Sequence, residues 1–246
     1  MLAWIILFSL LGSVGAVLGA ALVLVLPEKI RKFLVANLVS YATGTLLGAV
    51  FLGLVPKALQ ESPTPGILVW LLGGILFFFV MEKLILWRHC HLPECDVHAS
   101  AGPLLLIGDA FHNFTDGVII AGAFLLSVPL GIATGLAVIS HEIPQELGDF
   151  AILLESGYSR GQALLYNTLS ALATLPGALL GYYFLAHMMQ AVPYILLVGA
   201  ASFLYIALVD LIPYLHRRFG LADSLLQLGL ILVGIATIWL LHLPRN

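Results

Sequence analysis

The sequence predicts an all-α membrane protein, a single transmembrane domain of eight spanning helices, from its composition and from the spacing of its apolar segments. Of its 246 residues, 61% are apolar and only 9% are charged, whereas soluble domains are about 45–50% apolar and about 25% charged. A soluble fold of this length could not bury so much apolar surface, so lipid must be the solvent for much of the chain. The net charge of -3 gives no indication of nucleic-acid binding.

Eight segments have the roughly 20 mostly apolar residues that a spanning helix requires. They are 2–26, 34–56, 66–87, 103–127, 130–155, 162–186, 194–214 and 224–243. The first lacks a basic start and is too long for the apolar part of a signal peptide, so it is interpreted as a span. The short link Ser127-Val128-Pro129 should make the fourth and fifth segments an antiparallel hairpin.

The basic residues predict the orientation of these segments. On one side of the membrane they number eight: Lys29, Arg31, Lys32, Lys83, Arg88, Arg160, Arg217 and Arg218. The other side has only Lys57 and Arg245. Because basic residues are enriched in cytoplasmic loops, both termini are expected to be extracytoplasmic.

Ionisable side chains concentrate in the fourth and fifth segments. The helical repeat places them in three stripes: Asp109, His112 and Asp116; Glu142, Glu146 and Asp149; and His141 with Gln145. A carboxylate at the bilayer centre costs roughly 2.5–3.5 kcal/mol, and neither segment contains a Lys or Arg to offset it. Protonation, a water-filled cavity or a bound cation would each relieve this cost, and all three are typical of a transport pathway.

The ligand chemistry favours a transition metal. Imidazole combined with carboxylate suits Zn²⁺, Fe²⁺ or Mn²⁺, whereas calcium and magnesium prefer oxygen. The pairs His112/Asp116 and His141/Gln145 each lie about 6 Å apart along a helix, so they can converge on one ion between facing helices.

Three further residues of the fifth segment and its neighbour add to this expectation. Asn113 follows His112 and Glu142 follows His141, so these two residues could form a second shell or a neighbouring second site. Pro144 cannot donate a backbone hydrogen bond and distorts the helix beside the site. Transporters often build their ion sites from such interrupted helices.

At these residues the sequence resembles the ZIP family of metal transporters. HNFTDG at 112–117 resembles the family motif HNxxDG, and HEIPQELGD at 141–149 resembles HExPHExGD. Supporting matches cover almost the whole chain in order: ATGTLLGA at 42–49, FFxxEK at 78–83, YNxLS at 166–170 and LYIALVDLIP at 204–213.

The resemblance implies eight spans, extracytoplasmic termini and a homodimer in which spans 1, 4, 5 and 6 move, elevator-like, against a scaffold of 2, 3, 7 and 8. It implies His112, Asp116, His141 and the residue at 145 as metal ligands, with Asn113, Glu142 and Glu146 as accessory residues. Two positions depart from the family pattern: Gln145 stands where this branch usually has His, and Thr174 stands near a glutamate of some relatives. A complete binuclear site is therefore not expected.

Other polar residues have two interpretations each. Asp109, Asp149 and Asp210 are expected to be pathway or gating residues, or else hydrated or structural ones. The cytosolic loop 88–102 could sense or deliver metal, or could be a solvated loop; its candidate ligands are His89, Cys90, His91, Cys95 and His98.

The sequence thus predicts a transporter of the plasma membrane or bacterial inner membrane that carries Zn²⁺ toward the cytoplasm, with Fe²⁺, Mn²⁺ or Cd²⁺ as alternative cargo and no organic cofactor. An intramembrane metalloenzyme is an alternative, since His141-Glu142 begins an HExxH-like sequence, but Gln145 and Pro144 depart from that pattern. A proton-coupled carrier of organic substrates is another.

Overall fold

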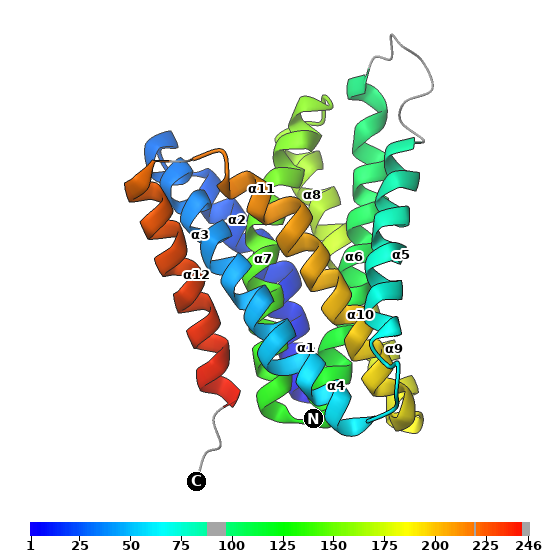
Figure 1. The fold of residues 1–246 in the computed structure, drawn as a ribbon. Coiled ribbons are helices and arrows are strands. Elements are labelled where there is room, and N and C mark those ends of the chain that lie inside the picture. The colour runs from blue at the N-terminus through cyan, green and yellow to red at the C-terminus, as the bar shows by residue number, and fades with distance from the viewer. Residues whose placement is uncertain (88–96, 219, 243–246) are drawn as a thin grey trace.

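The computed structural model describes residues 1–87, 97–218 and 220–242, and within them every regular element is a helix. The helices group into eight long rods that lie side by side in one bundle (Figure 1). The all-α prediction is therefore confirmed for these residues. By length and composition, five rods qualify as membrane spans: Leu2–Leu24, Glu28–Glu61, Arg160–His187, Met189–Leu215 and Leu221–Leu241.

Four of the eight rods consist of several consecutive helical pieces. The first is α1 (Leu2–Leu10), η1 (Leu11–Gly15) and α2 (Ala16–Leu24), and the second is α3 (Glu28–Gly48), η2 (Ala49–Leu54) and α4 (Val55–Glu61). Then follow α5 (Val69–Trp87), α6 (Val97–Leu126) and α7 (Val128–Glu155). The last three rods comprise α8 (Arg160–Ala171) with α9 (Thr174–His187); η3 (Met189–Ala191), α10 (Val192–Tyr205), η4 (Ile206–Leu211) and α11 (Ile212–Leu215); and α12 (Leu221–His242).

The segments η2 and η4 are π-helical, and each ends two residues before a proline, Pro56 or Pro213. Proline cannot donate to the carbonyl four residues earlier and its ring crowds that carbonyl. A wider π turn just before the proline accommodates both effects, and such turns occur frequently at functional sites.

Two expected boundaries differ from the structure. The helix expected over 162–186 is divided after Ala171, because Pro176 cannot bond back to Leu172, and Thr174 begins the new helix α9. Within the stretch 88–102, expected to be a loop, α6 already begins at Val97 and continues through Pro103.

The α6–α7 link is as tight as the sequence predicts. Ser127 is the N-cap of α7, where its Oγ accepts a hydrogen bond from the Leu130 N–H at 3.3 Å, and Pro129 occupies the first turn. A cap of this kind satisfies a backbone donor that the helix start leaves free. The antiparallel hairpin brings the polar stripes of α6 and α7 face to face.

Glycines bring α6 and α9 into backbone contact. A Cβ on Gly117 would collide with the Thr174 carbonyl oxygen, and one on Gly177 would collide with the Phe114 carbonyl oxygen. On the other side of the bundle α12 packs along α3 in the same way, through Gly44 and Gly234. Small residues permit this close packing where lipid supplies no hydrophobic drive.

The outer faces of the rods are apolar and the polar residues lie inside. Large exposed side chains include Leu22, Trp70, Leu232 and Trp239, as expected of a surface that faces lipid. The N-terminus and the far end of α12 lie at the same end of the bundle (Figure 1). At the opposite end, Arg218 donates a hydrogen bond to the Lys32 carbonyl oxygen at 3.5 Å.

We predict that Gly177→Ala lowers the free energy of unfolding by about 1–3 kcal/mol, since the added methyl group meets backbone that cannot rotate away. The matched control is Gly229→Ala on α12, where a Cβ has no neighbour within 4 Å. Circular dichroism during denaturation of the purified protein by SDS in mixed micelles measures both. Equal stability of the two variants would contradict the glycine contact.

Candidate metal centre

Four side chains from α6 and α7 converge at the centre of the bundle. His112 and Asp116 come from α6, and His141 and Glu142 come from α7. One ligand atom of each lies within 4.8 Å of all the others, and Asp116, His141 and Glu142 are buried. We refer to these four residues as the central cluster.

The spacing of the ligand atoms suits a tetrahedral ion. The Nε2 atom of His112 lies 3.3 Å from Glu142 Oε1 and 3.7 Å from Asp116 Oδ2. The Nε2 atom of His141 lies 3.3 Å from Asp116 Oδ2 and 3.7 Å from Glu142 Oε1, and the two Nε2 atoms are 3.2 Å apart. With bonds of about 2.0–2.1 Å to Zn²⁺, the edges of a regular tetrahedron are about 3.3–3.4 Å. The cluster therefore needs little rearrangement to enclose such an ion.

The ring of His141 is held in place by its surroundings. Its Nδ1 lies 2.9 Å from the Ala137 carbonyl oxygen, so Nδ1 carries the proton and the Nε2 lone pair faces the cluster. Phe203 of α10 packs against the ring with centroids 5.7 Å apart and an interplanar angle of 65°. The ring is thus oriented as a ligand before any ion arrives.

The two carboxylates of the cluster lack hydrogen-bond donors. Asp116 and Glu142 are 0% exposed, and neither oxygen of either carboxylate has a hydrogen-bond partner among the described residues. In the described part of the chain, their ion pairs are with His112 and His141. Burying an unpaired carboxylate is costly, and proteins normally pair such groups or place them on a metal. The arrangement favours a cation at its centre.

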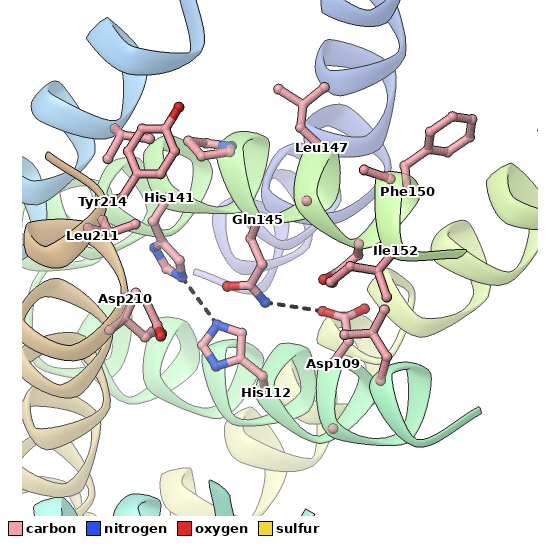
Figure 2. A pocket seen from close by; sticks show the side chains of 18 of the residues that line it. Asp109, His112, His141, Gln145, Leu147, Phe150, Ile152, Asp210, Leu211 and Tyr214 are labelled. Atoms are coloured by element: carbon pink, nitrogen blue, oxygen red, sulfur yellow. Dashed lines mark hydrogen bonds between the residues drawn. The ribbon is translucent and has the colours of Figure 1, made fainter. Parts of the chain in front are cut away.

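Gln145, an expected ligand, donates a hydrogen bond from its Nε2 to Asp109 Oδ1 at 3.2 Å. Glu142, expected as an accessory residue, is in the central cluster. Figure 2 shows His112 and His141 pointing toward one another while Gln145 points toward Asp109.

Asn113 belongs to a buried hydrogen-bond chain. Its Nδ2 donates to Asp109 Oδ1 at 3.0 Å, and its Oδ1 accepts a hydrogen bond from Thr174 Oγ1 at 2.8 Å. The division between α8 and α9 places Thr174 at this position. The chain Thr174–Asn113–Asp109–Gln145 therefore joins α9, α6 and α7 beside the cluster.

Two further acids of α7, Glu146 and Asp149, follow Gln145 along the helix. Glu146 is 0% exposed, and both of its carboxylate oxygens lack a hydrogen-bond partner in the described part of the chain. Its main-chain carbonyl accepts a hydrogen bond from Asn167 of α8 at 3.1 Å. Asp149 is 7% exposed and is also buried.

A cavity of about 980 Å³ reaches the central cluster from one end of the bundle. His112 and His141 line its inner part, and Arg31 and Lys32 line it near the start of α3. Asp210 from η4 also lines it, together with Glu82 and Tyr205, and Tyr205 donates a hydrogen bond to Glu82. His112 is the one partly exposed member of the cluster, with 15% of its side chain accessible.

The candidate ligands His89, Cys90, His91 and Cys95 lie outside the described residues, as does the side chain of His98. Two residues that the sequence reasoning missed are Phe203 and Asn167. The motif YNxLS, which contains Asn167, could have indicated that residue. Phe203 is an aromatic residue in an apolar span, and nothing in the sequence distinguishes it from its neighbours.

The helical bundle and its buried histidine–carboxylate cluster define a polytopic membrane protein with a candidate site for a divalent transition metal. Residues 88–242 match the family described as ZIP zinc transporter. Relatives include a protein described as zinc transporter ZIP13 of Pongo abelii, which is 35% identical over 96% of this chain and 78% of its own length. The ZIP13 homolog of Drosophila melanogaster is 33% identical over 93% of the chain and 86% of its own length.

This chain belongs to the ZIP zinc transporter family. It is accordingly an integral membrane protein and a transporter, not an enzyme, which confirms two of the expectations above. A zinc transporter ZIP10 of Homo sapiens is 44% identical over 50% of the chain and 15% of its own length.

We predict that His141→Ala weakens Zn²⁺ binding to the purified protein by more than the roughly 10–100-fold that loss of an outer hydrogen-bond partner costs. Equilibrium dialysis of the detergent-solubilised protein measures this affinity. The matched control is His187→Ala, an exposed histidine at the end of α9. Equal affinity in the two variants would exclude His141 as a ligand.

Proposed function

We propose that this chain moves a divalent transition metal, with Zn²⁺ as the preferred cargo, across the membrane toward the cytoplasm through the central cluster. The observation that carries the proposal is the spacing of its ligand atoms: the two imidazole nitrogens lie 3.2 Å from one another and 3.3–3.7 Å from the two carboxylate oxygens. Membership of the ZIP family supports the same function.

The donor set supports zinc ahead of other cations. Two imidazoles with two carboxylates suit Zn²⁺, Fe²⁺, Mn²⁺ and Cd²⁺, whereas Ca²⁺ and Mg²⁺ require more oxygen ligands than the cluster offers. The relatives named above are described as zinc transporters. No organic cofactor enters this proposal.

The cluster would hold one ion at a time. A second ion beside the first would need Asn113 as a ligand, but its amide oxygen accepts the Thr174 hydroxyl at 2.8 Å and its nitrogen donates to Asp109. Thr174 has no carboxylate to offer such an ion.

The direction of transport is supported by the position of the cavity. It extends from the central cluster toward Arg31 and Lys32, and basic residues mark the cytoplasmic side. Toward the other end, Phe124 is fully buried and its ring packs against Phe8 with centroids 5.5 Å apart. Both observations support a state open to the cytoplasmic side, with the termini on the extracytoplasmic side.

Alternating access would come from an elevator-type movement of one group of helices against another. In this proposal α1, α2, α6, α7 and α9 form one group, joined by the close pairs α6·α9 and α6·α7, and α3 packs against α7 across the boundary to the second group. The pairs α3·α12 and α5·α10 form the second group. We propose that the first group carries the ion past the second, in a homodimer in the plasma membrane or bacterial inner membrane.

His112→Ala should abolish Zn²⁺ uptake into proteoliposomes, because one of four ligands is lost and the ion's path opens at this residue. A zinc-sensitive dye trapped inside the vesicles reports the initial rate. The control His187→Ala should transport at the wild-type rate. Zn²⁺ uptake by the His112→Ala variant at the wild-type rate would contradict the proposed route through the cluster.

Gln145→His should change the cargo preference. A histidine at position 145 lies one helical turn from His141. Its imidazole can turn toward the ion instead of bonding to Asp109, and a further nitrogen ligand favours Zn²⁺ over Mn²⁺. The measurement is the ratio of Zn²⁺ to Mn²⁺ uptake rates in competition, expected to rise at least about threefold for a nitrogen replacing an amide. An unchanged ratio would mean that position 145 never reaches the ion.

A further inference from the structure

The cavity that reaches the central cluster has walls of two kinds. Its volume of about 980 Å³ is at the upper end of the range for cavities that hold small organic ligands, about 300–1,000 Å³. Most of the side chains that line it are apolar, and Arg31 and Lys32 line it near the start of α3. The cavity therefore presents a largely hydrocarbon wall together with positive charge.

Several apolar side chains of the cavity wall are exposed rather than packed against protein. The exposed fraction is 39% for Phe111 of α6, and it is 38% and 36% for Ile152 and Leu154 of α7. Figure 2 shows Leu211 and Tyr214 at the opposite side of this cavity from Ile152. Because removing apolar surface from water is favourable, this wall suits a hydrocarbon chain.

The two basic side chains of the cavity can accept an anionic ligand. The Nη1 atom of Arg31 donates to the Leu24 main-chain oxygen at 3.4 Å, and no acid in the described part of the chain forms an ion pair with Arg31. The Nζ atom of Lys32 lies 2.5 Å from Glu28 Oε1, and these two side chains are 68% and 66% exposed. Such an exposed pair contributes little stability, so Lys32 can exchange Glu28 for another anion.

Two further arginines lie at the same rim, in the turn between α11 and α12. Arg218 donates a hydrogen bond to the Lys32 carbonyl oxygen at 3.5 Å. The Arg217 guanidinium lies 5.8 Å from the centre of the Tyr214 ring, and Tyr214 lines the cavity. Clusters of about four to eight basic residues beside membrane helices are typical of binding surfaces for anionic lipid headgroups.

The acids of the cavity determine how such a lipid would be oriented. Four acids line the cavity: Glu82, Asp109, Asp149 and Asp210. They repel an anionic headgroup, so the headgroup belongs at the rim with Arg31 and Lys32 and the hydrocarbon chain belongs inside. Asp109 and Asp149 are buried in the wall, so a chain there meets mainly apolar side chains.

We propose that the cavity binds one anionic phospholipid of the cytoplasmic leaflet, with its phosphate on Arg31 and Lys32 and one acyl chain along the apolar wall. The cavity is lined by α6 and α7 of the first group of helices and by α3 and α5 of the second. A chain in this position obstructs the movement of the two groups and covers the path from the central cluster. The lipid site stands without the proposed function, and only its effect on transport rests on that function.

The first test measures which lipid the purified protein retains. Native mass spectrometry with equal amounts of dioleoylphosphatidylglycerol and dioleoylphosphatidylcholine should show one retained phosphatidylglycerol per chain. The variant Arg31→Gln/Lys32→Gln should lower the preference for phosphatidylglycerol about thirtyfold, or about fivefold for each charge lost beside the headgroup. The matched control is Lys29→Gln/Arg160→Gln, two exposed basic residues that do not line the cavity; it should keep the wild-type preference.

A competition experiment separates the whole lipid from its headgroup alone. Inorganic phosphate and glycerol phosphate carry the anionic group without the acyl chains. Neither should displace the retained phosphatidylglycerol from the wild-type protein when added in excess, because the apolar wall contributes to binding. Displacement by either compound would show that the site holds a free phosphate group, and it would contradict the lipid.

The second test measures Zn²⁺ uptake into phosphatidylcholine proteoliposomes with and without phosphatidylglycerol. Phosphatidylglycerol should slow uptake by the wild type and by Lys29→Gln/Arg160→Gln relative to uptake by Arg31→Gln/Lys32→Gln. The negative surface charge that phosphatidylglycerol adds also concentrates Zn²⁺ at the membrane. That effect is common to all three proteins, so the comparison between them removes it.

The outcomes separate the lipid site from the proposed function. Equal retention of the two lipids by the wild-type protein overturns the site, and this comparison needs no variant. Unchanged retention by Arg31→Gln/Lys32→Gln overturns the placement of the headgroup, and an equal response of uptake in all three proteins overturns the obstruction. If His112→Ala transports normally the proposed function fails, but the retained lipid is unaffected.

Discussion

The structure depends on two carboxylates, Asp116 and Glu142, that face two imidazoles in the interior of the bundle without any donor of their own. Such a group is unstable in an apolar interior unless a positive charge is present at least part of the time. A Lys or Arg would supply that charge permanently and would stop transport. In the proposed function a cargo ion supplies that charge reversibly, so the unpaired negative charge that destabilises the cluster also attracts the ion.

Much of this organisation could be predicted from the sequence. The acids without basic partners, the tight turn at Ser127 and the stripes at helical spacing indicated that α6 and α7 hold the site. Each stripe defines a helix face, but the rotation of that face toward its neighbour is set by packing elsewhere. The contacts between α6 and α9 at Gly117 and Gly177 fix the rotation of α6.

That rotation explains the differences in the ligand set. Periodicity paired His141 with Gln145, yet the structure places Glu142 in the central cluster and leaves Gln145 with Asp109. Adjacent residues can both reach an ion that lies between their two directions, which spacing rules do not reveal. The division of α8 from α9 likewise depends on how Pro176 is accommodated, and it decides that Thr174, rather than an apolar residue, meets Asn113.

The ring of Phe203 belongs to α10 and the imidazole that it touches belongs to α7. In the proposed movement these helices travel apart, so the edge-on aromatic contact must be lost in every cycle. The contact that supports the metal ligand therefore also opposes the departure of the moving helices from the inward-open position. An aromatic pair of this kind contributes about 0.5–1.5 kcal/mol.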